Sequence, residues 1–153
     1  MTRETFDLQL SALNERLLAL GTMVTRVQEQ AIRALADRNA DLANELIAGD
    51  HAINQAQHDI EDQCLFLIAS QQPVARDLRL IFSISSIAWE LERMADHAKG
   101  IATLALRLVD QPMLKPLIDI PRMAEKTVDM LNRSLTAFIN HDIDAAKKIT
   151  GIL

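Results

Sequence analysis

Apolar residues recur at alternating steps of four and three along the first part of this 153-residue chain. They are, in order, Phe6, Leu10, Leu13, Leu17, Leu20, Val24, Val27, Ala31 and Ala34. Such a heptad pattern places an apolar stripe along one face of a long helix. A helix over about 4–37 must bury this stripe against other helices, so the chain is predicted to be all-α. Gly21 lies inside the pattern and weakens the helix by about 1 kcal/mol relative to alanine.

Breaks divide the rest of the chain into further helices. Asn39 is a good N-cap for a second helix that reaches about residue 71, and Pro73 marks the next turn. A third helix is predicted from near Val74 to before Pro112, on the seam Leu80, Ile84, Ile87, Leu91, Met94, Ala98, Ile101, Ala105 and Leu108. After a proline-containing stretch, a fourth helix spans about 117–139, and Asp142 caps a last short helix.

Long helices joined by short turns become antiparallel neighbours, so residues 1–110 are predicted to form an elongated antiparallel three-helix bundle. Residues 111–116 form a linker, and residues 117–153 start a second unit. Residues 137–146 resemble residues 34–43 at an offset of 103, with Asp142 in the place of Asn39 and Asp144 in the place of Asp41. The fourth helix is therefore predicted to repeat the first one and to open an incomplete second bundle.

Composition limits the classes of function. The net charge of −5 argues against a general nucleic-acid binder, which would carry a basic stripe. No stretch reaches the roughly 18 apolar residues of a membrane span, and the N-terminus has no apolar signal region. With the single Cys64, a disulfide framework and a cysteine-based zinc site are excluded, and a buried thiol is expected. The chain is predicted to be cytoplasmic.

Acidic side chains form the most specific candidate site. Glu92 and Asp96 are four residues apart and therefore share one helical face. If the second and third helices turn around Pro73, Asp50 lies level with Asp96, and Asn54 lies level with Glu92. Four oxygen-bearing side chains then meet on the surface, where they suit cations such as Mg²⁺, Ca²⁺, Mn²⁺ or Fe³⁺. The alternative is a solvated helical face with no bound ion.

No catalytic constellation is evident in the sequence. None of the four histidines has a glutamate three residues before it, as an inward-facing di-iron site would need. A glycine-rich phosphate loop and a His-Glu-x-x-His motif are also lacking, so the chain is predicted not to be an enzyme. Two alternatives stay open. They are a metal-free helical oligomerisation scaffold and a metal-dependent hydrolase that activates water at Asp50, Glu92 and Asp96.

Four segments together resemble the PhoU family of phosphate-uptake regulators, in the family's order and spacing. They are Gly49–Asn54, Gln72–Arg79, Glu90–Ala98 and Phe138–Ala146. The resemblance implies a fold of two similar three-helix bundles. It also implies metal binding at paired acidic motifs, with iron or zinc in some members and magnesium or manganese as further candidates here. Carried onto this chain, the metal ligands are Asp50, Asn54, Glu92 and Asp96, with asparagine at position 54 where aspartate is more common.

The role that the resemblance implies is regulatory. Family members act as cytoplasmic negative regulators of the phosphate-starvation response. They are protein–protein adaptors between the ATPase subunit of a phosphate ABC transporter and a sensor histidine kinase, and they meet the membrane only through these partners. The acidic motif of a second repeat is absent from this sequence, so at most one metal site is expected to be complete.

A homodimer is predicted from the C-terminal part of the chain. The helix over about 117–139 and the residues after it need a covering surface for their apolar side chains, which are Val128, Leu131, Leu135, Phe138 and Ile149. Either the first bundle or another copy of the chain must supply that cover, and exchange of these C-terminal elements between two copies is one way to do so.

Overall fold

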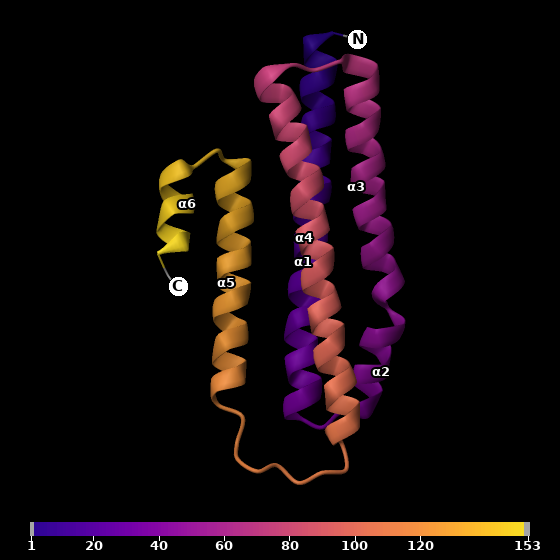
Figure 1. Ribbon diagram of the computed structural model, residues 1–153, viewed down its shortest axis with the longest axis vertical. Coiled ribbons are helices and arrows are strands. Elements are labelled where there is room, and N and C mark those ends of the chain that lie inside the picture. The colour runs from indigo at the N-terminus through magenta and orange to yellow at the C-terminus, as the bar shows by residue number, and fades with distance from the viewer. Residues whose placement is uncertain (1, 152–153) are drawn as a thin grey trace.

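The computed structural model describes residues 2–151, except for the side chain of residue 50. These residues form six helices (Figure 1), which are α1 (Arg3–Ala36), α2 (Ala40–Ala48), α3 (Asp50–Gln71), α4 (Ala75–Leu108), α5 (Asp119–Ile139) and α6 (Ile143–Thr150). Helices α1, α3 and α4 run side by side as an antiparallel bundle, which α2 completes at one end. Helices α5 and α6 lie on the opposite side of α1 from α3. The predicted all-helical bundle is confirmed.

The apolar stripe of α1 is the centre of the core, as the heptad pattern predicts. Every member of the stripe is buried except Val27, which is partly buried. Side chains from α3 and α4 complete this core, among them Ile53, Ile60, Leu67, Ile81, Ile84 and Leu91. None of the helices in the described part of the chain combines the length and the apolar character that a bilayer-spanning helix requires.

The seam predicted for α4 is correct at alternate positions. The buried residues that it includes are Ile84, Leu91, Ala98 and Ala105. Between them, the buried positions are shifted by one residue, to Ile81, Ala88, Ala95 and Ala102. The predicted residues Leu80, Ile87, Met94 and Ile101 are partly buried. Because α4 contacts three helices, α1, α2 and α3, its apolar face is wider than a two-helix seam, and alanines at its centre allow a close approach.

The helix predicted to end near residue 71 is two helices in the structure. Gly49 separates α2 from α3, and its N–H donates to the Glu45 carbonyl at 2.9 Å. The N–H of Ala52 donates to the Gly49 carbonyl at 3.3 Å, a tighter three-residue step. Glycine is a poor helix former, so it lowers the cost of such a break. The break directly precedes Asp50, the first predicted metal ligand.

Both predicted N-caps are confirmed. The side-chain oxygen of Asn39 accepts a hydrogen bond from the N–H of Leu42 at 3.0 Å. At the start of α6, the side-chain oxygen of Asp142 accepts one from the N–H of Ala145 at 2.9 Å. Each cap satisfies a backbone donor that the first turn of a helix leaves without an intrahelical partner.

The two helix junctions also share their backbone geometry. Arg38 and His141, which precede the caps, have the same left-handed φ of 53°. The N–H of Asn39 donates to the carbonyl of Ala34 at 3.0 Å, and the N–H of Asp142 donates to the carbonyl of Ala137 at 2.8 Å. Helices α1 and α5 therefore end with the same pattern of backbone hydrogen bonds. The equivalent residues are separated by the offset of 103 at which the two sequence segments resemble each other.

Helix α5 packs antiparallel to α1, and Gly21 makes this packing close. A Cβ at Gly21 would collide with the side chain of Leu135 as it now lies. The absence of a side chain at Gly21 therefore allows α5 to approach α1 closely. Nearby, Thr25 Oγ1 lies 3.5 Å from Asn132 Oδ1. Leu131, Leu135 and Ile149 are buried, and Val128 and Phe138 are partly buried. Of the two predicted covers, the first bundle of the same chain supplies one, so burial of these side chains does not require a second copy.

Cys64 lies in the core, as predicted. Burial, together with the nearby carboxylate of Glu61, raises the pKa of the thiol to about 11. Because the thiolate is scarce at pH 8, we expect Ellman's reagent to modify the folded protein about 100-fold more slowly than the unfolded chain. Equal rates with and without denaturant would contradict this burial.

The same pKa shift gives a pH dependence of stability. The folded pKa of Cys64 lies above the unfolded value, so folding disfavours the thiolate. The contribution of the thiol to stability is full below roughly pH 8.5 and declines as the pH rises toward the folded value.

Candidate functional site

The α2–α3 break lies beside a cavity of about 230 Å³ in the bundle. Gly49 and Ile53 line the cavity at the break, and Ala95 and Lys99 line it from α4. These two pairs therefore lie at one level of the bundle. The pairing predicted from a hairpin turn at Pro73, with Asp50 level with Asp96 and Asn54 level with Glu92, stays a prediction.

The structure describes the side chains of three of the four predicted metal ligands. Asn54 on α3 and Glu92 on α4 are partly buried, and Asp96, one turn further along α4, is exposed. The side chain of Asp50 lies outside the described part of the chain. Among the side chains that are described, no group of three or more histidines, cysteines, aspartates or glutamates is arranged to hold a metal ion. The four-residue metal site thus stays a prediction.

The three described ligands carry the oxygen atoms that a hard cation prefers, although these three side chains by themselves do not form a metal site. The side-chain oxygen of Asn54 is shielded from solvent, and an amide oxygen can ligate a hard cation. Glu92 and Asp96 add carboxylates at helical spacing on α4. A metal held here would have Asn54, Glu92 and Asp96 as donors, with the Asp50 carboxylate as the fourth.

Lys99 is a further neighbour of the predicted ligands, which no sequence motif indicates. It lines the cavity at the break and follows Asp96 by three residues, so both lie on one side of α4. The spacing was visible in the sequence, but the cavity that brings Lys99 level with Gly49 depends on the break between α2 and α3. Its ammonium group adds a positive charge to this part of the bundle.

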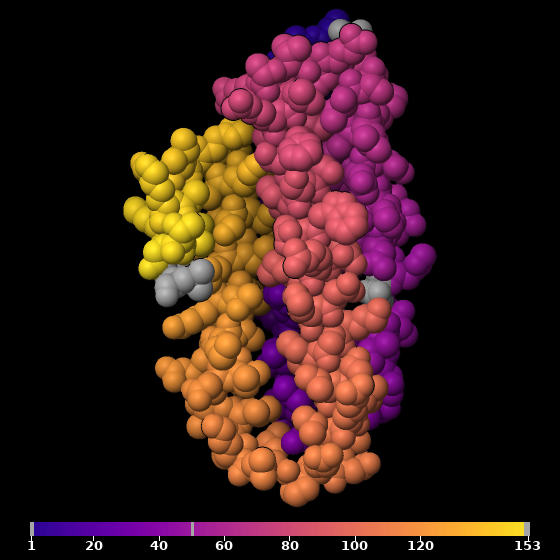
Figure 2. Space-filling model, in the orientation of Figure 1, coloured from indigo at the N-terminus to yellow at the C-terminus, as the bar shows by residue number. Residues whose placement is uncertain are grey.

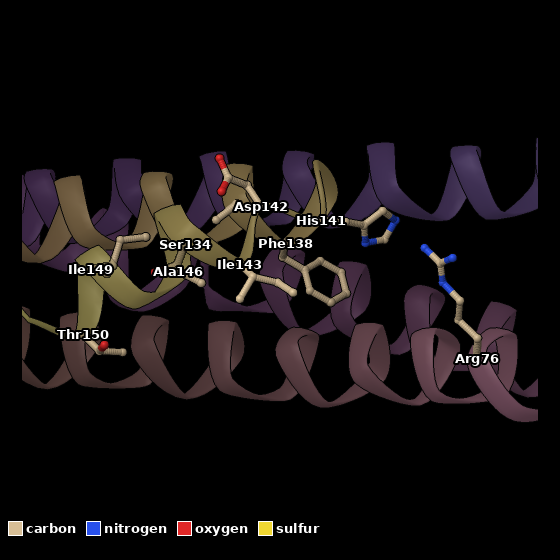
Figure 3. A pocket seen from close by; sticks show the side chains of 10 residues that line it. Arg76, Ser134, Phe138, His141, Asp142, Ile143, Ala146, Ile149 and Thr150 are labelled. Carbon is tan, nitrogen blue, oxygen red and sulfur yellow. The ribbon is translucent and has the colours of Figure 1, made fainter.

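A larger cavity, of about 550 Å³, lies between the α5–α6 pair and the start of α4. Away from this cavity, beside the N-terminal half of α5, the space-filling view shows a furrow between α5 and α4, with the indigo surface of α1 at its floor (Figure 2). The cavity is lined by apolar side chains from α5 and α6, and Arg76 of α4 and His141 lie toward each other at one end (Figure 3). No sequence pattern indicates this cavity, because it depends on how α5 packs on α1.

Comparison with known proteins places these features in a family. The sequence model of the family described as PhoU domain matches residues 17–105. A phosphate-specific transport system accessory protein PhoU homolog from Aquifex aeolicus is 39% identical over 141 residues, which are 92% of this chain and 64% of that protein. The protein of the same description from Streptococcus pneumoniae is 39% identical over 147 residues, which are 96% of this chain and 68% of that protein.

A solved structure shows the same fold. The crystal structure of the phosphate transport system regulatory protein PhoU from Streptococcus pneumoniae superposes with a TM-score of 0.85 at 38% sequence identity. The superposition covers 94% of this chain and 68% of that chain. The present chain therefore spans about two thirds of the length of the proteins that it matches.

Proposed function

Because this chain belongs to the PhoU family, we propose that it is an accessory protein of phosphate transport that regulates phosphate uptake and phosphate-starvation signalling. The observation that carries the proposal is the similarity of nearly the whole chain to proteins described as phosphate-specific transport system accessory proteins. Its action is that of a cytoplasmic adaptor and negative regulator between a phosphate ABC transporter and a sensor histidine kinase. The proposal assigns it no catalytic activity.

Exposed apolar side chains on α4 support an adaptor role. Phe82 is 68% exposed and Trp89 is 51% exposed, and both lie on one face because they are seven residues apart. Leu78, 40% exposed, precedes Phe82 by one turn of the same face. Large apolar side chains grouped on a surface mark protein interaction sites. A protein that bridges two partners needs such docking surfaces.

The adaptor role is tested by binding to the ATPase subunit of a phosphate transporter. The purified 153-residue chain is expected to bind the immobilised subunit, and the double variant F82A/W89A is expected to bind at least about tenfold more weakly. Leu8→Ala is the control, because Leu8 is 67% exposed but lies on α1. If the unaltered protein does not bind the subunit, the adaptor proposal fails in this form.

The metal site is part of the proposal and has its own prediction. Replacing both Glu92 and Asp96 by alanine is expected to abolish metal uptake, since it removes the two α4 carboxylates of the predicted site. Helicity should stay near its original value, because Glu92 is only partly buried and Asp96 is exposed. Elemental analysis of protein purified without chelators measures the loss and identifies the metal as iron, zinc, magnesium or manganese.

A matched control for this variant exists on α5. Glu125 and Asp129 are likewise carboxylates four residues apart, both are exposed, and they lie outside the predicted site. The double variant E125A/D129A is expected to keep the metal content of the unaltered protein. If the variant at positions 92 and 96 also keeps stoichiometric metal, the ligand assignment is wrong.

The homodimer stays a prediction, but the apolar surface that supports it is the connection from α4 to α5 and not the covered face of α5. Leu114, Ile118 and Met123, around the connection from α4 to α5, are exposed apolar side chains of the kind that a second copy would cover. Sedimentation velocity at tens of micromolar protein is expected to show a dimer, and the double variant L114S/M123S a monomer. A pure monomer for the unaltered protein would contradict the prediction.

A further inference from the structure

We propose that the outer face of the α3–α4 pair docks one amphipathic α-helix of a partner protein, and that this helix carries lysine or arginine beside its apolar stripe. We call this surface the α3–α4 face. It combines the side chains of Leu78, Phe82 and Trp89 on α4 with the carboxylates of Glu61 and Asp62 on α3. The inference rests on the proposed adaptor function, to which it adds the chemistry of the partner segment.

The apolar part of the α3–α4 face is a second heptad stripe on α4. Its positions are 78, 82, 85 and 89, at steps of four, three and four, and Ser85 is the only polar residue among them. The core stripe of the same helix lies at other positions, which are 81, 84, 88 and 91. Both aromatic rings of the second stripe, Phe82 and Trp89, are exposed. A helix that packs along this stripe would bury the two rings as anchors.

The acidic side chains of α3 lie level with Trp89 along the bundle. Ile53 of α3 and Ala95 of α4 line the same cavity, so they lie at one level. Because α3 and α4 run antiparallel, residues that follow Ile53 lie level with residues that precede Ala95. Glu61 and Asp62 are eight and nine residues after Ile53, and Trp89 is six residues before Ala95. The carboxylates and the indole are therefore within about one helical turn of each other along the bundle.

Glu61 also lies on the side of α3 that faces α4. Its carboxylate is near the thiol of Cys64, and this thiol lies beside the backbone of Ser85 on the second stripe. The buried Gln57 orients the same carboxylate, because Gln57 Nε2 donates to Glu61 Oε2 at 3.2 Å. The Glu61 carboxylate thus flanks the stripe of exposed side chains on α4.

The charges around the α3–α4 face favour a cationic partner. Residues 39–75, which include all of α2 and α3, contain no lysine or arginine, and their acidic residues are Asp41, Glu45, Asp50, Asp59, Glu61 and Asp62. On α4, Arg93 is paired with Glu90 at 3.0 Å. A lysine or arginine of a docked helix is therefore attracted to the carboxylates of α3, and the face of the Trp89 indole also attracts a cation. The same carboxylates repel an anionic lipid surface or a nucleic acid.

The α3–α4 face lies away from the C-terminal helices. Helices α5 and α6 are on the opposite side of α1 from α3, and among residues 2–151 neither packs against α3 or α4. The internal repeat assigns the helices of a second bundle to the side of α5 and α6, so those helices would not cover this face. In the space-filling view, the surfaces of α3 and α4 adjoin and face the viewer (Figure 2).

Trp89 is the only tryptophan of the chain, so its fluorescence reports directly on the α3–α4 face. The probe is a synthetic peptide of about 18 residues without aromatic residues, with leucine at helical positions i, i+3, i+4 and i+7 and lysine at the others. Titration with this peptide is expected to give a saturable blue shift of the Trp89 emission with a Kd below about 50 µM. Quenching by acrylamide should fall at least about twofold, because the docked helix covers the indole. No saturable shift, or a shift with unchanged quenching, overturns the proposal.

A second peptide tests the charge of the partner. It has glutamate in place of every lysine, keeps the apolar stripe, and is expected to bind at least about tenfold more weakly. Raising the salt concentration from about 50 to about 500 mM should weaken binding of the lysine peptide about fivefold, because salt screens the attraction between exposed charges. Equal or tighter binding of the glutamate peptide contradicts the cationic partner.

Two double variants locate the carboxylates. E61Q/D62N removes the two negative charges level with Trp89 and keeps an acceptor for Gln57, and it is expected to weaken binding of the lysine peptide about fivefold. E125Q/D129N removes the same two charges from α5, on the other side of α1, and should leave binding unchanged. Equal binding by the two variants, at equal helicity, means that the peptide binds elsewhere and that the proposal is wrong.

The outcome is separable from that of the adaptor test. If the ATPase subunit binds but the lysine peptide does not, this inference fails and the adaptor proposal stands. If the peptide binds as described but the subunit does not, the adaptor proposal fails and the chemistry of the α3–α4 face stands.

Other occupants of the face would give different results. A blue shift of Trp89 with vesicles of phosphatidylglycerol and phosphatidylcholine would identify a lipid surface as the occupant. A blue shift that grows with the concentration of the protein alone would identify a second copy of the chain. Either result makes the partner-helix proposal wrong.

Discussion

Replacing Leu17 by alanine is expected to lower the free energy of unfolding by about 3–4 kcal/mol. Leu17 is fully buried on the α1 stripe, in the core that α1 shares with α3 and α4. The variant loses the transfer free energy of the removed methyl groups and leaves a cavity that a close-packed interior fills incompletely. Urea denaturation followed by circular dichroism measures the change, and the melting temperature should fall by about 10 °C.

The neighbouring residue is the control for this prediction. Leu18 is 40% exposed, so Leu18→Ala removes apolar surface that water already reaches. Its effect is expected to be below about 1 kcal/mol. A similar loss in both variants would mean that the heptad stripe does not face the core of the folded protein.

Replacing Gly21 by tryptophan is expected to detach α5 and α6 from α1 and to leave the bundle of α1, α3 and α4 folded. The new side chain would occupy the space of Leu135, which is buried in the core together with Leu131. Loss of these two buried side chains removes about 3–6 kcal/mol of docking free energy. Trypsin should then cleave α5, at Arg122, Lys126 and Arg133, at least about tenfold faster than in the unaltered protein.

Two other glycine variants sharpen this prediction. Gly100 has no neighbouring atom within 4 Å of an added Cβ, so Gly100→Trp should leave the rate of proteolysis unchanged. Gly21→Ala should change stability by less than about 1 kcal/mol, because the gain in helix propensity offsets the rotation of the Leu135 side chain. If Gly21→Trp and Gly100→Trp are cleaved at the same rate, the packing of α5 on Gly21 is contradicted.

Features that depend on local physics could be predicted from the sequence. The burial of the α1 stripe follows from a helical period that any long helix must obey. The caps at Asn39 and Asp142 follow from side-chain oxygens that reach a backbone N–H three residues ahead. The two segments that contain these caps are similar in sequence, and in the structure they also make equivalent backbone hydrogen bonds at the same offset.

Features that depend on contacts between distant residues could not be predicted. Gly49 and Gly21 both lie in helical sequence patterns, but the first breaks its helix and the second provides space for Leu135. The burial of Ala95 instead of Met94 depends on how many neighbours α4 has. For the candidate metal site, the pairing of α3 with α4 stays a prediction, and the cavity with Lys99 could not be predicted because it follows from the break at Gly49.

Regulation of the phosphate-starvation response is tested most directly in bacterial cells that lack their own PhoU and carry a reporter under a starvation-responsive promoter. In phosphate-rich medium, expression of this chain is predicted to lower the reporter to its repressed level, and the F82A/W89A variant is predicted to leave it high. A reporter that stays high although the unaltered protein accumulates in folded form would contradict the regulatory function.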